Sequence, residues 1–326
     1  MLTVKYSKDN QRPTQAVKNP RIAILMCTYN GERFLRQQLD SFFAQSHSNW
    51  TLVVSDDGST DSTQQLLQHY IKQWGADRLY ITNGPQRGYA ANFLSLTRKA
   101  KTLVKADFYA WSDQDDIWQK DKLQTALHHI GNIHSEIPAL YCGRTQLISA
   151  SGSPIGKSTN FQRPPHFLNA LVQSISGGNT MVFNQAALDL LQETHEDVTV
   201  ASHDWWAYQL ISGAGGMIYF DSDAKILYRQ HEHNLIGSKL DWLARLKHLA
   251  LVFHGLHSNW NTQNISALEN MQHYLNDENR LRLQQFKIAR QEKLPKRLLS
   301  FIKLGVYRQT VKGNIAMYAS ILLKTI

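Results

Sequence analysis

The sequence contains only two cysteines, Cys27 and Cys142, and both lie inside apolar stretches of strand length. A disulfide framework or a zinc site needs several thiols at characteristic spacings, so two isolated cysteines argue against both. We therefore expect two buried, free thiols and a reducing compartment.

Long hydrophobic runs are also missing. No stretch of about 18 apolar residues occurs, so the sequence predicts no membrane-spanning helix. The first 20 residues lack the apolar core of a signal peptide and are interpreted as a polar N-terminal extension. The remaining 306 of the 326 residues are expected to divide into a domain of residues 21–240 and a helical C-terminal region of residues 241–326.

Acidic residues are almost absent from the end of the chain. Between Arg280 and Ile326, eleven Lys or Arg residues stand against one acid, Glu292, whereas the whole chain carries a net charge of +9. The rest is therefore close to neutral and contains no recognised nucleic-acid module, so no nucleic-acid partner is expected. Apolar residues between these cations favour a basic helical region on an anionic membrane surface. The alternative is a helix packed on the body or on a partner chain.

Strand-like and helix-like stretches alternate through the first part of the chain. Four apolar runs each end in a polar loop that is followed by helical periodicity, at residues 21–27, 50–55, 79–82 and 108–111. Further strands are expected at residues 140–148, 181–183, 216–220 and 224–228, and residues 149–165 are expected to be a loop. This order predicts an α/β fold with a mostly parallel sheet and functional residues at the carboxyl ends of its strands.

The fourth apolar run is followed by three carboxylates within four positions, Asp113, Asp115 and Asp116. Carboxylates this close repel one another, and a divalent cation is the usual compensation. An Asp-x-Asp loop supplies the oxygen ligands that Mg²⁺ or Mn²⁺ prefers and leaves room for phosphate oxygens. The alternative from these residues alone is a solvated acidic turn.

Other loops carry residues suited to a nucleotide and to proton transfer. The loop at residues 28–31 places backbone amides at a helix start, but it lacks the Gly-x-Gly-x-x-Gly of nicotinamide-binding folds. Asp56 and Asp57 follow the second strand and can accept hydrogen bonds from a base or a ribose. Asp204 begins a helix, where it is either a general base or a carboxylate stabilised by the helix dipole.

Four motifs occur in order: Cys27–Gly31, Ser55–Asp61, Ser112–Trp118 and His203–Trp205. Together they resemble the family 2 glycosyltransferases with the GT-A fold, and most closely the rhamnosyltransferase-type enzymes of bacterial polysaccharide and O-antigen pathways. The resemblance covers residues 21–237. It implies a Rossmann-like, mostly parallel mixed sheet flanked by helices. Because the Gln-x-x-Arg-Trp motif of processive synthases is missing, it also implies an enzyme that adds one sugar per event.

The resemblance assigns roles to individual positions. Asp204 matches the catalytic base. The positions that match sugar-donor binding are Thr28, Tyr29, Asn30, Glu32, Asp56, Asp57, Arg87, Asn92, Asp113, Gln114 and Arg229. The positions assigned to acceptor binding are Gly178, Asn179 and Trp205. The positions assigned to the metal are Asp113, Asp115 and His231, with Asp115 favoured as the direct ligand.

The implied reaction is an inverting transfer, dependent on Mg²⁺ or Mn²⁺, from a nucleotide-sugar donor to a saccharide hydroxyl. The resemblance favours L-rhamnose from dTDP-rhamnose, and a UDP-hexose is the alternative. The acceptor is expected to be a lipid-linked intermediate of bacterial surface polysaccharide synthesis. The protein is then expected in the cytoplasm, held peripherally at the inner face of the cell membrane. From a different class, a non-catalytic membrane-surface adaptor is the other hypothesis.

Overall fold

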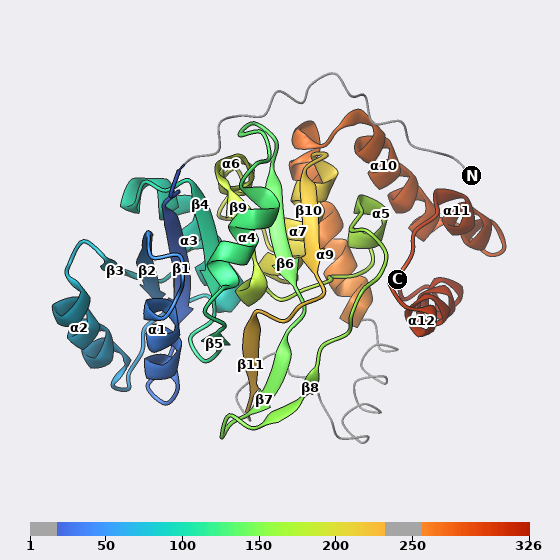
Figure 1. Ribbon diagram of the computed structural model, residues 1–326. Coiled ribbons are helices and arrows are strands. Elements are labelled where there is room, and N and C mark those ends of the chain that lie inside the picture. Colours follow the sequence, from blue (N-terminus) through green and yellow to red (C-terminus); the bar gives the residue numbers. More distant parts are fainter. Residues whose placement is uncertain (1–17, 232–255) are drawn as a thin grey trace.

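The computed structural model describes residues 18–231 and 256–326. Its centre is a seven-stranded sheet in the order β10-β6-β9-β4-β1-β2-β3 (Figure 1). The strands are β1 (Ile22–Thr28), β2 (Trp50–Asp56), β3 (Leu79–Asn83), β4 (Phe108–Ser112), β6 (Ala139–Gly143), β9 (Val182–Asn184) and β10 (Met217–Asp221). All neighbouring pairs are parallel except the two that involve β9, which runs antiparallel to β4 and β6. The predicted mostly parallel α/β sheet is confirmed.

Helices cover both faces of this sheet, which explains why β1 and β2 are apolar along their whole length. One apolar cluster lies under α1 (Leu35–Phe43), α2 (Thr63–Trp74) and α4 (Lys122–Ile130). A second lies under α3 (Tyr89–Leu103), α5 (Phe167–Ala170), α6 (Gln185–Gln192) and α7 (His203–Gly213). Cys27 and Cys142 are buried free thiols, as predicted.

A second sheet has the order β5-β11-β7-β8, made of β5 (Ile117–Trp118), β11 (Ile226–Gln230), β7 (Gln146–Ser149) and β8 (Pro154–Lys157). The single strand predicted at residues 140–148 is therefore wrong, because β6 and β7 belong to different sheets. The loop predicted at residues 149–165 contains β8. The first difference arises because β7 pairs with the distant β11, a partner that a local sequence pattern does not reveal. The second arises because β8, rich in Gly and Pro, is an edge strand that pairs only with β7 among the described residues.

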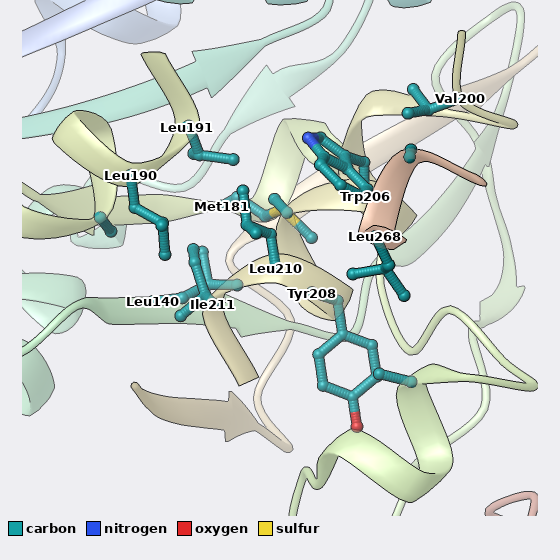
Figure 2. Packing of buried hydrophobic residues seen from close by; sticks show 14 of the residues in the cluster. Leu140, Met181, Leu190, Leu191, Val200, Trp206, Tyr208, Leu210, Ile211 and Leu268 are labelled. Carbon is teal, nitrogen blue, oxygen red and sulfur yellow. The ribbon is translucent and has the colours of Figure 1, made fainter. Parts of the chain in front are cut away.

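The C-terminal helices α9 (Leu256–Asn270), α10 (Asp277–Gln291), α11 (Lys296–Leu304) and α12 (Val311–Leu323), with the short η3 (Gln272–Tyr274), pack on the body (Figure 1). Figure 2 shows Leu268 of α9 beside Trp206 and Tyr208 of α7. Phe286 and Phe301 are fully buried and meet edge to face, with ring centroids 5.5 Å apart. The predicted domain boundary at residue 240 and the first 17 residues of the extension predicted at residues 1–20 lie outside the described residues.

Hydrogen bonds also join this region to the body. The Asn279 side chain donates to the carbonyls of Ser212 and Gly213, 3.0 and 3.1 Å away, at the end of α7. Arg308 Nε donates to the Val172 carbonyl at 3.2 Å. Within the described residues, no helix is both long and apolar enough to cross a membrane. Residues 256–326 therefore pack on the body, and the predicted contact of this region with a membrane stays a prediction.

Candidate functional site

The loops after β1 and β2 are joined into one cradle by two side chains of the first loop. Asn30 Oδ1 accepts a hydrogen bond from the backbone N–H of Thr60 at 2.8 Å, and a Glu32 carboxylate oxygen accepts one from Ser62 at 2.8 Å. Asn30 has a φ of 48°, a left-handed conformation that asparagine tolerates better than most residues. Both residues match sugar-donor binding, but here they hold the two loops together.

Asp56, at the end of β2, is almost completely buried and bonded within the protein. Its carboxylate accepts from Thr28 Oγ1 at 2.9 Å, from the Ser59 hydroxyl and N–H at 2.5 and 3.1 Å, and from Gln64 Nε2 at 2.6 Å. A carboxylate has about four lone-pair sites, and four hydrogen bonds fill them. The hydrogen bonds that Asp56 is predicted to accept from the base or ribose therefore stay a prediction, since its oxygens are engaged within the protein here. The same holds for the Thr28 hydroxyl, which Asp56 occupies.

Asp57 is only half-buried and remains the accessible carboxylate of this loop. One of its oxygens accepts from the backbone N–H of Gln86 at 2.6 Å. Asn92, assigned to donor binding, is buried and exchanges hydrogen bonds of 2.6 and 3.1 Å with Ser55, so it fastens α3 to β2 instead. Arg87 is exposed in the loop that precedes α3.

Tyr29 and Gln114 connect the first loop to the acidic loop, which we define as Asp113–Asp116. The Tyr29 N–H donates to Gln114 Oε1 at 2.9 Å, and Gln114 Nε2 donates back to the Tyr29 carbonyl at 3.0 Å. A Cβ at Gly31 would overlap the same Gln114 oxygen, so glycine is required there for this contact. The Tyr29 side chain itself is exposed by 58%, which leaves its ring free as a flat apolar surface.

Crowding and burial of carboxylates disfavour the ionised form of Asp113 in the acidic loop. Burial, with Asp115 and then Asp204 nearby, raises the pKa of Asp113 to about 8, and Lys122 opposes this shift. Burial, followed by the carboxylates of Asp204 and Asp113, raises the pKa of Tyr89 to about 12. Asp113 at the end of β4 and Asp204 at the start of α7 are therefore electrostatic neighbours, although 91 residues separate them in the sequence.

Asp115 meets His231 at the other side of this loop. Asp115 Oδ2 and His231 Nε2 lie 2.8 Å apart, and the imidazole packs against the Phe34 ring at 5.0 Å between centroids. Two of the three predicted metal ligands are thus side by side. Within the described residues, no three His, Cys, Asp or Glu side chains form a group that could hold a metal ion. A preformed three-residue site with Asp113 is therefore not observed.

Asp116 is fully buried and was assigned no role from the sequence. Its carboxylate accepts from Asn179 Nδ2 at 2.5 Å and from the Arg229 N–H at 3.1 Å. Burial and then Asp115 and Asp113 raise the pKa of Asp116, while these two hydrogen bonds act in the opposite direction.

Asp204 lies in the first turn of α7 and is half-buried. One oxygen accepts from the Ser202 hydroxyl at 2.5 Å and from the Trp205 N–H at 2.6 Å, and the other accepts from the Gly178 N–H at 3.2 Å. A carboxylate at this position is also stabilised by the helix dipole. Three hydrogen-bond donors fix its orientation and leave about one of its four lone-pair sites free.

The model of glycosyl transferase family 2 matches residues 23–190 of the chain. The chain belongs to this family. It is 28% identical to the dTDP-rhamnosyl transferase RfbG of Shigella flexneri, an alignment that covers 75% of this chain and 83% of that one. The protein is thus a glycosyltransferase, as its four motifs predicted.

Solved glycosyltransferases share the fold and confirm the predicted GT-A architecture. S. aureus TarS in complex with UDP-GlcNAc matches with a TM-score of 0.53 and 14% identity, over 94% of this chain and 89% of that one. The mannosyltransferase PcManGT from Pyrobaculum calidifontis, in complex with GDP-Man and Mn²⁺, matches with a TM-score of 0.52 and 16% identity, over 96% and 87%.

Arg229 of this glycosyltransferase supports the acidic loop from beneath. It is buried, and its guanidinium donates to the carbonyls of Asp115 at 2.9 Å and Ala150 at 3.0 Å, and to the Gln37 side chain. It also lies over the Phe34 ring, 4.6 Å from the centroid. These contacts are with the protein itself, and the predicted contact of Arg229 with the donor diphosphate stays a prediction.

The residues assigned to acceptor binding are likewise held inside the glycosyltransferase. Trp205 is buried, and its Nε1 donates to the Ala170 carbonyl at 2.7 Å. Asn179 is buried against Asp116, and Gly178 contributes its backbone N–H to Asp204. All three positions make contacts within the protein, and their predicted role in acceptor binding stays a prediction.

Sequence reasoning missed Tyr89 and Lys122. The carboxylates of Asp204 and Asp113 both contribute to the raised pKa of Tyr89. Lys122 is fully buried with its ammonium 3.3 Å from the centroid of the Trp118 ring, and burial lowers its pKa against the effect of Asp116 and then Asp113. A lysine on the same helix face as Leu123, Ala126 and other apolar residues is a signal that could have identified it.

Proposed function

We propose that this glycosyltransferase moves one sugar, L-rhamnose from dTDP-L-rhamnose, to a saccharide hydroxyl with inversion at the anomeric carbon. The observation that carries the proposal is the hydrogen-bonded connection between the acidic loop and Asp204 of α7: Asn179 donates to Asp116, and the adjacent Gly178 N–H donates to Asp204. It brings the metal and diphosphate side of the site next to a carboxylate able to act as a base. Similarity to a dTDP-rhamnosyl transferase supports the donor, and a UDP-hexose remains the alternative.

The nucleotide would lie in the cradle of the first two loops. The exposed Tyr29 ring offers a stacking surface for the base, and Asp57 offers a carboxylate oxygen to a base N–H or a ribose hydroxyl. Because Asn30 and Glu32 already join the two loops, the cradle is preorganised, and less ordering free energy opposes nucleotide binding.

The acidic loop suits a divalent cation by the chemistry of its side chains. Asp115 and His231 supply an oxygen and a nitrogen within 2.8 Å of one another. Burial, Asp115 and Asp204 raise the pKa of the nearby Asp113, and a bound cation would oppose that shift. Asp113, Asp115 and His231 would hold Mg²⁺ or Mn²⁺, with diphosphate oxygens completing the ligands. When bound, the cation offsets the negative charge that develops on the departing diphosphate.

Asp204 would remove the proton from the acceptor hydroxyl. Its one free lone-pair site gives the hydroxyl a single direction of approach, and the acceptor oxygen must lie within about 3 Å of the carboxylate oxygen for proton transfer. The acceptor oxygen then attacks the anomeric carbon as the bond to the diphosphate breaks on the opposite face. A single displacement with one base inverts the anomeric configuration.

A thermal-shift titration tests the donor site. A ligand that binds only the folded state stabilises it by about 2.7 kcal/mol at a hundred times its Kd. We expect dTDP to raise the melting temperature in the presence of Mn²⁺ and much less in its absence, and we expect the Asp115→Asn variant to lose the metal-dependent part. A larger rise in melting temperature with UDP than with dTDP would favour a UDP-hexose as the donor. No shift with either nucleotide would refute it.

We also propose that the acceptor is lipid-linked and that the outer faces of α11 and α12 rest on an anionic membrane at its cytoplasmic side. Apolar side chains are exposed there, namely Leu299, Ile302, Val311, Ile315, Leu322 and Leu323. Exposed lysines accompany them at positions 296, 303, 312 and 324. This combination suits a surface of anionic headgroups, since the lysines match the charge and the apolar side chains enter the acyl boundary.

Vesicle flotation tests this surface. The double variant Leu299→Glu, Ile302→Glu should float less with phosphatidylglycerol vesicles than the unaltered protein. Met217→Glu is the control, because Met217 is equally exposed, at 53%, but lies on β10. Two results would contradict the membrane proposal: equal flotation of the double variant and the control, or flotation of the unaltered protein with vesicles of neutral phosphatidylcholine only. Neither result would bear on the transfer reaction.

A further inference from the structure

We infer that Asp116 and Asn179 are positioning residues that lock the acidic loop to the catalytic base. The inference rests on the proposed role of Asp204. A continuous set of contacts carries it: Asp116 accepts from the Asn179 side chain, and the neighbouring Gly178 donates its N–H to Asp204. The loop that faces the sugar donor and the base that faces the acceptor are therefore joined through two consecutive residues.

Neither residue is accessible to a substrate. Asp116 is completely buried and Asn179 is 3% exposed. The Asp116 carboxylate is occupied from two directions, by Asn179 and by the N–H of Arg229 at the end of β11. Its neighbour Asp115 meets His231, two residues further along the same segment. Asp116 thus fixes the inner side of the acidic loop, while Asp113 and Asp115 lie on its outer side.

The segment that carries Asn179 is held rigidly. Gly178–Thr180 forms the short helix η2, and Thr180 Oγ1 donates to the Gly177 carbonyl at 2.9 Å. A Cβ at Gly178 would overlap the imidazole of His203, which is itself stacked on Phe93 with ring centroids 4.0 Å apart. Because η2 cannot move independently of its surroundings, a displacement of Asn179 is passed on to the N–H that orients Asp204.

Removal of the Asn179 side chain should therefore change the chemical step more than nucleotide binding. Misplacement of a reacting group by about 1 Å costs on the order of 10²-fold in rate. We expect Asn179→Ala to lower kcat by about that factor while the Kd for dTDP changes less than threefold, since the cradle of the first two loops is untouched. Asn169→Ala is the matched control, because Asn169 is also fully buried but bonds Tyr208 and the Tyr307 carbonyl.

A side-chain exchange gives a sharper test. Asp116→Asn alone leaves one oxygen for two hydrogen-bond donors, and Asn179→Asp alone brings two carboxylates together. The double variant Asp116→Asn, Asn179→Asp restores both hydrogen bonds with the polarity of the first reversed. We expect each single variant to lose kcat and the double variant to recover at least tenfold over the poorer one, measured well below the melting temperature of each protein.

The results separate this inference from the proposed function. Unchanged turnover in Asp204→Asn would remove the base and, with it, the function proposed above. Loss of activity in Asp204→Asn together with full kcat in Asn179→Ala would overturn only the positioning role. A fall in kcat of Asn169→Ala as large as that of Asn179→Ala, or no recovery in the exchanged double variant, would show that the contact matters for folding alone and would also overturn it.

Discussion

Asp204→Asn is the substitution that examines the mechanism most directly. It keeps the size and shape of the side chain and replaces one carboxylate oxygen by an amide NH₂. The remaining oxygen can still accept from the Ser202 hydroxyl and the Trp205 N–H. The amide nitrogen then faces the Gly178 N–H, which loses its acceptor at 3.2 Å. One hydrogen bond is lost, and the ability to take up a proton disappears entirely.

The two losses differ in size. Loss of one hydrogen bond to a charged group costs about 1.5–3 kcal/mol of stability. General-base catalysis contributes about 10²–10⁴-fold, which corresponds to about 2.7–5.4 kcal/mol in the activation free energy. We therefore expect kcat to fall by at least about 10²-fold in a protein that remains folded at 25 °C.

The assay is release of dTDP at saturating donor and acceptor, together with calorimetric titration of dTDP in the presence of Mn²⁺. The Kd should stay within about threefold, because Tyr29 and Asp57 lie on another loop. Turnover equal to that of the unaltered enzyme would remove Asp204 from the mechanism. A lost dTDP affinity would show instead that the substitution disturbs the donor site, and the assignment of a base would have to be withdrawn.

Three further predictions follow from single contacts. Tyr29→Ala should weaken dTDP by about 5–150-fold, from the 1–3 kcal/mol of a stacked base, while Tyr29→Phe should bind normally in the same titration. Burial, with Asp115 and Asp204, raises the pKa of Asp113 from 3.8 to about 8, so the folded protein retains a proton that the unfolded chain releases. Without metal, its stability should fall as pH rises from about 4 to about 8, and urea unfolding of Asp113→Asn should lack this component; an identical pH dependence would disprove the assignment. Phe301→Ala should cost about 3–5 kcal/mol in urea unfolding, and Leu299→Ala, on the exposed side of α11, less than about 1 kcal/mol.

The sequence predicted the main sheet well because its information is local. The runs that became β1, β2 and β4 are continuous and apolar, and each ends where a polar loop begins. The acidic loop and Asp204 were identified for the same reason, since short motifs mark them. The alternating pattern predicted a mostly parallel sheet, and the fold then brings Asp113 and Asp204 close enough for each carboxylate to affect its surroundings.

The sequence did not show whether a given polar side chain hydrogen-bonds to a neighbouring group of the protein itself. Arg229 and Asn92 have the right chemistry for a phosphate or a sugar, yet they bind carbonyls and a serine of their own chain. Whether a side chain binds the protein or faces solvent depends on how deeply it is buried. Burial in turn depends on long-range strand pairing, such as that of β11 with β7. The arrangement of the basic C-terminal region was ambiguous for the same reason. Its apolar residues do not reveal their burial from the sequence, since Phe286 is buried and Ile288 is exposed on the same helix.

Helix α7 has one end in the chemistry and the other in the C-terminal region. Asp204 lies in its first turn, and Asn279 of α10 binds the carbonyls of Ser212 and Gly213 at its last. A shortened protein or a chimera that replaces residues 256–326 would uncover those carbonyls and the apolar side of α7 before it altered any substrate contact. An exchange of the C-terminal helices must therefore include α7, so that the helix carrying Asp204 keeps its partners and the two regions move as one unit.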